Sequence, residues 1–142
     1  MTQLNGFHYK TAIAVRFADI DAFGHVNNAV YLTYFEIARS SYWDEVVHWD
    51  WTQMGIIIGR AEINYLKPIE LNDRVLAYVR TSRVGNSSFD VDYALVKIVN
   101  GEEVLCTTGS TSCVTFDYRL NASAAIPDAH RIKMLEFEAL EV

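Results

Sequence analysis

The sequence predicts an α+β fold, a five-stranded antiparallel sheet wrapped around one long helix, with a short helix near the C-terminus. Three observations predict it. Apolar side chains recur at helical spacing from Ala29 onward, and the chain after the tryptophan-rich segment reads as successive strands with no second long helix between them. The chain has 142 residues, of which 51% are hydrophobic. That is enough for one core, so we expect residues 1–142 to form a single domain.

The composition argues against several classes of partner. Twelve Lys and Arg against 18 Asp and Glu give a net charge of −6, which offers no general attraction to nucleic acids or to anionic membranes. The N-terminal residues lack the basic, then apolar, then small-residue order of a signal peptide, and the longest apolar run is Gly55 to Ile58. We therefore expect a cytoplasmic protein that binds neither nucleic acid nor membrane.

The first expected elements are a short strand and the long helix. Residues 11–17, TAIAVRF, are rich in β-forming side chains and lead directly into a polar cluster. An amphipathic helix of about 18 residues should follow from Ala29, with Asn27 or Asn28 capping its start. Its apolar face comprises Tyr31, Phe35, Ala38 and Tyr42.

The remaining elements are four strands and the short helix. The strands are expected at residues 56–69, 73–84, 87–99 and 102–116, arranged as a meander in chain order. The Asn100-Gly101 pair indicates a hairpin turn with positive φ at both residues, and residues 83–88 supply another turn. Pro127 is expected to open the C-terminal helix. Such a sheet leaves an open edge, which predicts a homodimer or a homotetramer.

The polar cluster before the long helix allows a structural and a catalytic interpretation. Capping and turn formation explain Asp19 and the two asparagines at the helix start. Capping does not explain Asp21 and His25, a carboxylate and an imidazole four residues apart with Gly24 between them. A helix N-terminus also offers unpaired N–H donors and about half a positive charge, which suit a developing oxyanion. The cluster therefore suggests an acyl-transfer site.

The cluster and the helix also carry a family resemblance. DIDAFGHVNNAVYLTYFEIARSSYW resembles the motif D-x-D-x-x-G-H-V-N-N-x-x-Y-x-x-Y-x-E-x-A-R of the hotdog-fold acyl-CoA thioesterases of the 4-hydroxybenzoyl-CoA thioesterase type. RAEINYLKPIELNDRVLAYVRTSRVGNSSFDVDYALV is similar to the same family's second and third strands. The resemblance spans residues 10–118 and implies a hotdog fold and hydrolysis of an acyl-CoA thioester.

The resemblance implies roles for particular residues. The family's catalytic carboxylate corresponds to Asp21, which would act as a nucleophile or as a general base toward water. The plant acyl-carrier-protein thioesterases share the string HVNN and use its histidine, which implies a catalytic role for His25. Those enzymes have an asparagine two residues after the aspartate, where this chain has Phe23. The family's oxyanion hole is made by backbone N–H groups at the helix start, which correspond to Val26, Asn27 and Asn28.

Substrate contacts are expected at three further residues. Arg83 lies where related enzymes present basic side chains to CoA phosphates, and Ser88 corresponds to a residue near the thioester in some members. Tyr31 is a candidate for the acyl tunnel, although a core position explains it better. Arg60 and Lys67 are weaker candidates for CoA contacts, and Glu36 is expected to be a surface or pairing charge.

No metal or cofactor is expected, because the histidines lack ligand-like spacing and CoA is part of the substrate. The segment GSTSC at residues 109–113 lacks the second glycine of a nucleophile elbow. Two alternatives to acyl-CoA hydrolysis stay open: a non-catalytic acyl-CoA-binding hotdog module and a thioesterase acting on acyl carrier protein. The sequence does not identify the acyl group.

Overall fold

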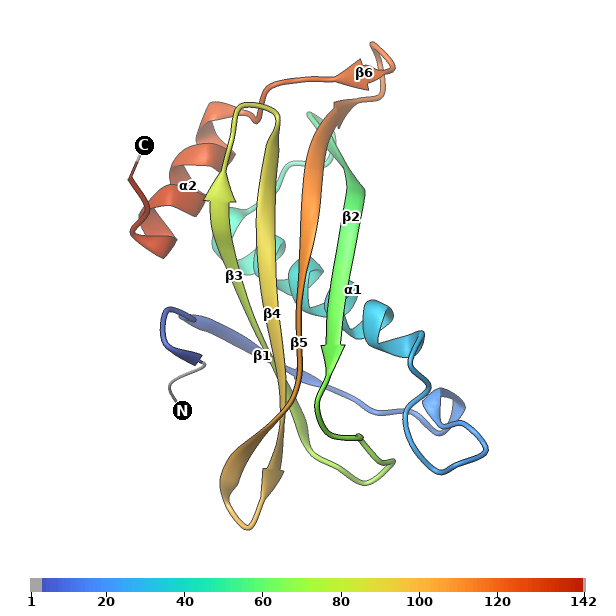
Figure 1. Ribbon diagram of the computed structural model, residues 1–142. Helices are drawn as coiled ribbons and strands as arrows, with labels where there is room; N and C mark the ends of the chain where they lie inside the picture. The colour runs from blue at the N-terminus through green and yellow to red at the C-terminus, as the bar shows by residue number, and fades with distance from the viewer. Residues whose placement is uncertain (1–3, 142) are drawn as a thin grey trace.

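The structure is a computed structural model that describes residues 4–141. The order of elements is shown in Figure 1: β1 (Tyr9–Ile13), α1 (Val30–Tyr42), β2 (Gly55–Tyr65), β3 (Val75–Val84), β4 (Ser88–Val99), β5 (Glu102–Asp117), β6 (Ala122–Ser123) and α2 (Asp128–Glu138). A short 3-10 turn, η2 (Phe17–Asp19), precedes α1, and a π-helical turn, η3 (Trp43–Val47), continues it. Together α1 and η3 span the helical length that the sequence predicts.

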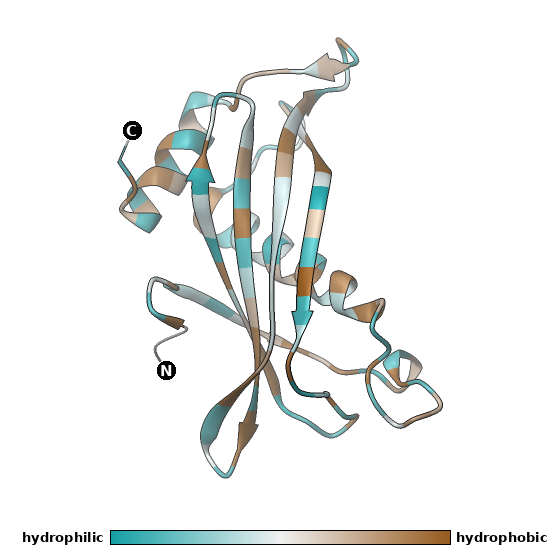
Figure 2. Cartoon of the chain, in the orientation of Figure 1, coloured by the Kyte–Doolittle hydropathy of each residue, from teal (hydrophilic) through white to brown (hydrophobic). Residues whose placement is uncertain are grey.

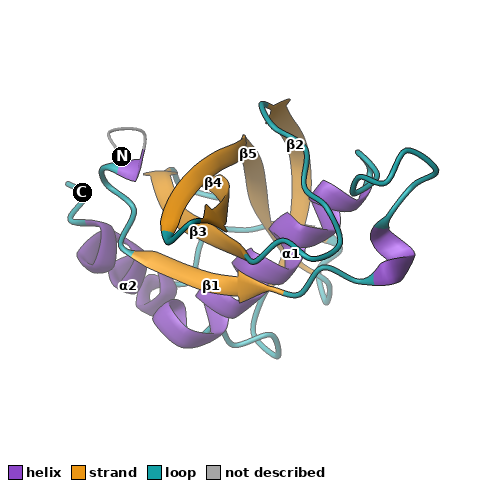
Figure 3. Ribbon diagram, turned by 90° about the horizontal axis from the view of Figure 1, so that it is seen from below, coloured by secondary structure: helices purple, strands orange, loops and turns teal. Residues whose placement is uncertain are grey.

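The strands form one antiparallel sheet in the order β1-β3-β4-β5-β2, with β6 added beside β5. The sheet curls around α1, as the view from below shows (Figure 3). This confirms the expected fold class. The meander in chain order is wrong for one strand, because β2 pairs with β5 and forms the edge opposite β1. Pairing between strands adjacent in sequence is a tendency and not a rule.

Two strands are shorter at the ends nearest the polar cluster than the sequence suggests. β1 pairs with β3 from Tyr9 to Ile13, so residues 14–17 have already left the sheet. β2 ends at Tyr65, because the N–H groups of Leu66 and Lys67 both donate to the carbonyl oxygen of Cys106 and the chain turns away there. Both changes lengthen the loops beside the start of α1.

The core lies between α1 and the concave face of the sheet. Apolar and polar residues alternate along α1 (Figure 2), and its buried side chains are Tyr31, Tyr34, Phe35, Ala38 and Tyr42. The Phe35 ring stacks on Tyr93 of β4 with 4.3 Å between centroids. Each such buried side chain contributes about 1.5–3 kcal/mol. Burial of this face fixes α1, and with it the loop that precedes the helix.

Glycine at position 109 makes room for the helix. A Cβ at this position of β5 would lie 2.5 Å from the Phe35 ring and 2.7 Å from the carbonyl oxygen of Glu62. Contacts this short do not occur between real side chains, so any larger residue would move the ring or the strand. The expected turn at residues 100 and 101 is confirmed, with φ values of +52° and +79°.

α2 packs beside β3 and η3, on the same side of the sheet as α1, where the Phe137 ring meets that of Tyr42, and it follows Pro127 as expected. His130 and Met134 are buried, and Arg131 donates to the carbonyl oxygens of Gly85 and Asn86 in the turn between β3 and β4. Within residues 4–141, no helix has the length and apolar character needed to cross a membrane.

Candidate active site

The loop between η2 and α1 closes on itself just before the helix. Ile20 and Val26 form an isolated antiparallel bridge, and the N–H of Asp21 donates to the carbonyl oxygen of His25 at 2.9 Å. Gly24 adopts φ of +84°, in the left-handed region that favours glycine. This turn brings the carboxylate and the imidazole predicted from the sequence to one side of the loop.

Asp21 uses only one carboxylate oxygen to hold this turn. Its Oδ1 accepts a hydrogen bond from the N–H of Phe23 at 2.9 Å and a longer one from the N–H of His25 at 3.5 Å. Its Oδ2 has no hydrogen-bond or ion-pair partner among the described residues. The residue is half-buried and lines a groove, so one oxygen is available to a molecule bound there.

The groove is about 430 Å³ in volume and lies between the start of α1 and the end of β2. It is lined by Asp21, His25, Val26, Asn28, Tyr31, Tyr65, Leu66, Lys67 and Pro68. Tyr31 is 3% exposed, and its ring meets that of Tyr65 edge-on at 5.0 Å between centroids. Burial raises the pKa of Tyr31, so its hydroxyl remains protonated at neutral pH.

The three backbone N–H groups expected to bind an oxyanion are not equivalent. The N–H of Val26 donates to the carbonyl oxygen of Ile69, and that of Asn27 donates to Asp19, both at 2.8 Å. The N–H of Asn28 makes no hydrogen bond to another described residue. Of the three, Asn28 is therefore the donor that a ligand in the groove could use.

The start of α1 is held from both sides of Asn28. The Asn27 side chain accepts a hydrogen bond from the N–H of Ala29 at 2.9 Å and so holds the turn just before the helix, whose N-cap residue is Ala29 and not Asn27 or Asn28 as predicted. The Tyr65 hydroxyl donates to the carbonyl oxygen of Asn28 at 2.7 Å. Tyr65 is not among the site residues predicted from the sequence, because the expected strand continues to residue 69 and gives no sign of the turn at this position.

Asp19 has a structural environment distinct from that of Asp21. Its carboxylate is buried and accepts hydrogen bonds from the side chain and N–H of Arg16 and from the hydroxyl of Tyr34. Burial alone would raise the pKa of Asp19, but these hydrogen bonds outweigh it and hold the pKa below its ordinary value. Asp19 thus fixes the loop to the helix, which agrees with its structural interpretation.

His25 and Lys67 supply the other ionisable groups that line the groove. The imidazole Nε2 of His25 lies 3.9 Å from a carboxylate oxygen of Glu70. The His25 side chain is 44% exposed, so solvent weakens this interaction. Lys67 is exposed at the opposite wall and brings a positive charge to the groove, although the sequence makes it a weaker candidate for CoA contacts than Arg83.

Arg83 and Ser88 do not lie near this groove. The sheet register places Tyr65 level with Ala77 of β3, six residues from Arg83, or roughly 20 Å along the strand. Arg83 pairs with Asp90 and contacts Ser88 at the turn between β3 and β4, at the end of the sheet remote from the loop (Figure 1). A substrate in the groove would have to extend over about this distance to reach either residue of the same chain.

The described residues contain no group of three or more His, Cys, Asp or Glu side chains placed to hold one metal ion. Cys106 and Cys113 are both buried and free, and burial raises the pKa of each thiol. Neither cysteine lines the groove at Asp21.

Comparison with known proteins agrees with the fold. Residues 15–134 match the profile described as thioesterase-like superfamily. A thioesterase from Thermus thermophilus, crystallised with coenzyme A and Zn, is 33% identical, with a TM-score of 0.82 over 97% of this chain and 99% of that one. The uncharacterised protein YsmA of Bacillus subtilis is 32% identical over 109 residues, covering 76% of this chain and 72% of YsmA.

A more distant relative is named as a thioesterase that acts on acyl carrier protein. The chloroplastic acyl-acyl carrier protein thioesterase ATL3 of Arabidopsis thaliana is 25% identical over 138 residues, which covers 94% of this chain and 70% of that protein. These relatives support thioester hydrolysis in general terms.

Proposed function

This chain belongs to the thioesterase-like superfamily, and we propose that it hydrolyses acyl-CoA thioesters at the groove beside Asp21. One observation carries the proposal: the carboxylate of Asp21 keeps an oxygen without a partner among the described residues, in a groove that is also lined by Asn28, whose N–H makes no hydrogen bond to another described residue. A base and an oxyanion donor on one groove are the two groups that thioester hydrolysis requires. The helix-start motif favours the 4-hydroxybenzoyl-CoA thioesterase branch of the superfamily.

The general-base route needs no other nucleophile from the protein. Asp21 takes a proton from water while the water oxygen bonds to the thioester carbonyl carbon, and the carbonyl electrons move to oxygen. The N–H of Asn28 stabilises that oxyanion. When the carbonyl re-forms, the carbon–sulfur bond breaks and the CoA thiolate takes the proton from Asp21. If Asp21 attacks the carbonyl itself, the carbon–sulfur bond breaks, CoA leaves as its thiolate and a mixed anhydride forms. Water then hydrolyses the anhydride, which releases the free acid and restores the Asp21 carboxylate.

The rate accelerations that a base and an oxyanion donor supply are large enough for the hydrolysis of a thioester. A positioned base contributes roughly 10²–10⁴-fold and one oxyanion donor roughly 10²–10³-fold. Because the Asp21 side chain is fixed by its turn, the free oxygen is held in one place and little freedom is lost when substrate binds. His25 orients or tunes this site, and Lys67 is the positive charge on the groove wall that the anionic CoA moiety could contact.

We further propose that the chain forms a homodimer through β2. This strand is 11 residues long and pairs on one side only, with β5. Ile57 on the strand is 39% exposed, and Leu32 and Ile37 on the adjacent flank of α1 are 44% and 47% exposed. An unpaired edge beside exposed apolar side chains is the kind of surface that a second copy covers.

A thiol-release assay tests the proposed function. Acyl-CoAs from short to long and from aliphatic to aromatic are incubated with the protein, and free thiol and free acid are measured together with the heat of binding. The proposal expects equal amounts of thiol and acid from at least one acyl-CoA. Saturable binding without release would contradict it in favour of the binding module, and release from acyl carrier protein alone would favour the other alternative.

A further inference from the structure

Three hollows follow one another along the seam between α1 and β2. The first is the groove at Asp21. The second, about 270 Å³, includes Thr33 on the helix and Ala61 on the strand, and the third, about 530 Å³, includes Ser40 and Ile56. Residue numbers rise along α1 as they fall along β2, so the hollows lie in sequence from the start of the helix to its end. We refer to them together as the α1/β2 furrow. Leu32 and Ile37 line it and also belong to the face that the proposed homodimer covers, so in the dimer the second copy would roof the furrow.

The walls of the outer part of this furrow are mostly apolar, and one cation is set among them. The second and third hollows are lined by Ile37, Ile56, Ile58, Leu32, Ala61 and Trp51 together with polar residues of α1. Arg39 lines both hollows, and its side chain is only 11% exposed. Its guanidinium lies 5.9 Å from the centre of the Trp43 ring. A nearly buried arginine in an apolar channel is costly unless an anion pairs with it.

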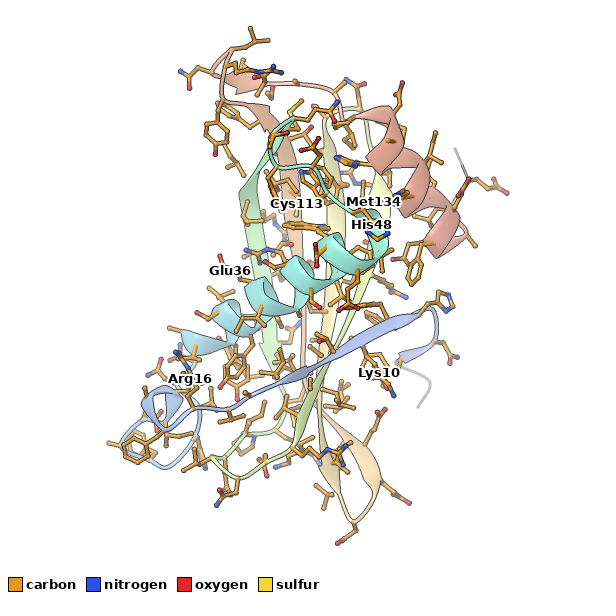
Figure 4. All side chains as sticks on the ribbon, turned by 180° about the vertical axis from the view of Figure 1, so that it is seen from behind. Lys10, Arg16, Glu36, His48, Cys113 and Met134 are labelled. Carbon is orange, nitrogen blue, oxygen red and sulfur yellow. The ribbon has the colours of Figure 1, made fainter. Side chains whose placement is uncertain are left out.

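The charge of Arg39 is weakly compensated within residues 4–141. Its single ion-pair partner there is Glu36, whose nearest oxygen is 3.7 Å away, too long for a hydrogen bond. The Glu36 side chain is 66% exposed and lies on the flank of α1 nearest β2 (Figure 4), where water competes for its charge. Trp43 adds a second donor: its Nε1–H is buried and has no acceptor among the described residues. The Tyr93 hydroxyl also lies beside Arg39, but it carries no charge. The guanidinium therefore has no carboxylate at hydrogen-bond distance, and the Trp43 N–H has no acceptor among the described residues.

From this arrangement we propose that the furrow selects acyl groups that end in a carboxylate, which Arg39 binds. The inference rests on the proposed function, because it takes the thioester carbonyl to lie at Asn28. Arg39 is 11 residues further along, so the distance is roughly 16 Å along the helix axis. The arginine side chain shortens the remaining gap, since helical side chains lean toward the N-terminus. An extended acyl chain of roughly eight to twelve carbons, with bonds of about 1.5 Å, spans the distance that remains between the thioester carbonyl at Asn28 and the guanidinium of Arg39.

Two thioesters of equal length test the inference: decanoyl-CoA and the mono-CoA thioester of decanedioic acid. We expect kcat/KM to be about 10- to 100-fold higher for the carboxylated substrate, as a hydrogen-bonded ion pair of ordinary strength would give. In Arg39→Met that ratio should fall to within about twofold of one, whereas Arg39→Lys should retain part of it. In Glu36→Gln it should rise, because the competing carboxylate is gone.

Arg119→Met is the matched control, since Arg119 is exposed and pairs with Asp117 away from the furrow. Its ratio should equal that of the unmodified protein. A direct measurement avoids dependence on turnover: decanedioate should bind more tightly than decanoate by calorimetry, and Arg39→Met should abolish the difference. If neither thioester releases thiol but decanedioate still binds through Arg39, the proposed function fails and this inference stands. Equal kcat/KM and equal binding for both acids would overturn the inference and leave the hydrolase proposal intact.

Discussion

The Tyr65 hydroxyl donates a hydrogen bond to the carbonyl oxygen of Asn28 over 2.7 Å, and so joins the end of β2 to the first turn of α1. The same peptide segment carries the N–H of Asn28, which has no partner among the described residues. Tyr65 therefore fixes the orientation of the donor that we assign to the oxyanion.

Replacing Tyr65 with phenylalanine should lower kcat about 2- to 10-fold while leaving the fold intact, because one neutral hydrogen bond contributes about 0.5–1.5 kcal/mol. Steady-state thiol release and circular dichroism measure the two effects. Tyr118→Phe is the control, since Tyr118 is exposed and its hydroxyl makes no hydrogen bond to another described residue. A Tyr65→Phe variant with unchanged kcat would show that this hydrogen bond does not position the donor.

Gly109→Ala should destabilise the protein by about 1–3 kcal/mol, because the added methyl group meets the Phe35 ring and the Glu62 carbonyl oxygen at once. Urea unfolding measures the change. Gly59→Ala provides the comparison, since a Cβ there has its nearest neighbour at 3.7 Å and should alter stability by no more than about 0.5 kcal/mol. Equal stabilities for the two variants would contradict the close approach of α1 to β5.

The free energy of unfolding should fall on mild acidification, because His130 is held in its neutral form in the native state. Its Nε2 accepts a hydrogen bond from the N–H of Asp50, so the ring is neutral in the native state. Burial lowers the pKa of His130 below its ordinary value of 6.5, while Asp50 opposes and Lys133 assists the shift. The unfolded chain therefore binds a proton more readily, and stability is lost as pH falls from 6.5 toward the lower native pKa.

Unfolding free energies from pH 7.5 to 5 test this expectation. The decline should be shallower in His130→Gln, which cannot titrate. His48→Asn is the control, because His48 is exposed and asparagine tolerates its left-handed backbone. A slope that is the same in His130→Gln and in the unmodified protein would assign the pH dependence to other groups.

A charge placed on the unpaired edge of β2 should disrupt the proposed homodimer. Ile57→Lys places a positive charge on the unpaired edge and should shift the sedimentation coefficient toward that of a monomer. Val99→Lys changes a side chain of similar exposure, 40%, at the end of β4 and should leave assembly unchanged. A monomeric unmodified protein, or an Ile57→Lys variant that assembles normally, would contradict the β2 interface.

Much of the fold was predictable because it depends on local signals. The spacing of Tyr31, Phe35 and Tyr42 identified α1, and the Asn100-Gly101 pair fixed the turn between β4 and β5. The position of β2 was not predictable in the same way. The strand that pairs with β2 is set by the path of the chain around α1. No feature of residues 55–65 indicates whether β3 or β5 lies beside them.

In the candidate site, too, the local structure was predictable from the sequence and the contacts with distant parts of the chain were not. The loop from Asp21 to His25 is a local structure, and its glycine and polar residues indicated it. The oxyanion donors were expected as a group of three, but two of them are occupied by carbonyl oxygens of Asp19 and Ile69. The second of these comes from a distant part of the chain. Likewise, Lys67 reaches the groove because β2 ends at Tyr65, which the strand pattern did not reveal.

The most direct test of the hydrolase account is the turnover of Asp21→Asn. Asparagine keeps the side-chain oxygen that holds the turn but cannot accept the proton of water or attack the thioester, so kcat should fall by roughly 10²–10⁴-fold with the unfolding free energy little changed. Asp44→Asn, at an exposed position in η3, should behave like the unmodified protein. His25→Ala should give a smaller loss. Near-normal thiol release by a folded Asp21→Asn variant would contradict the central claim.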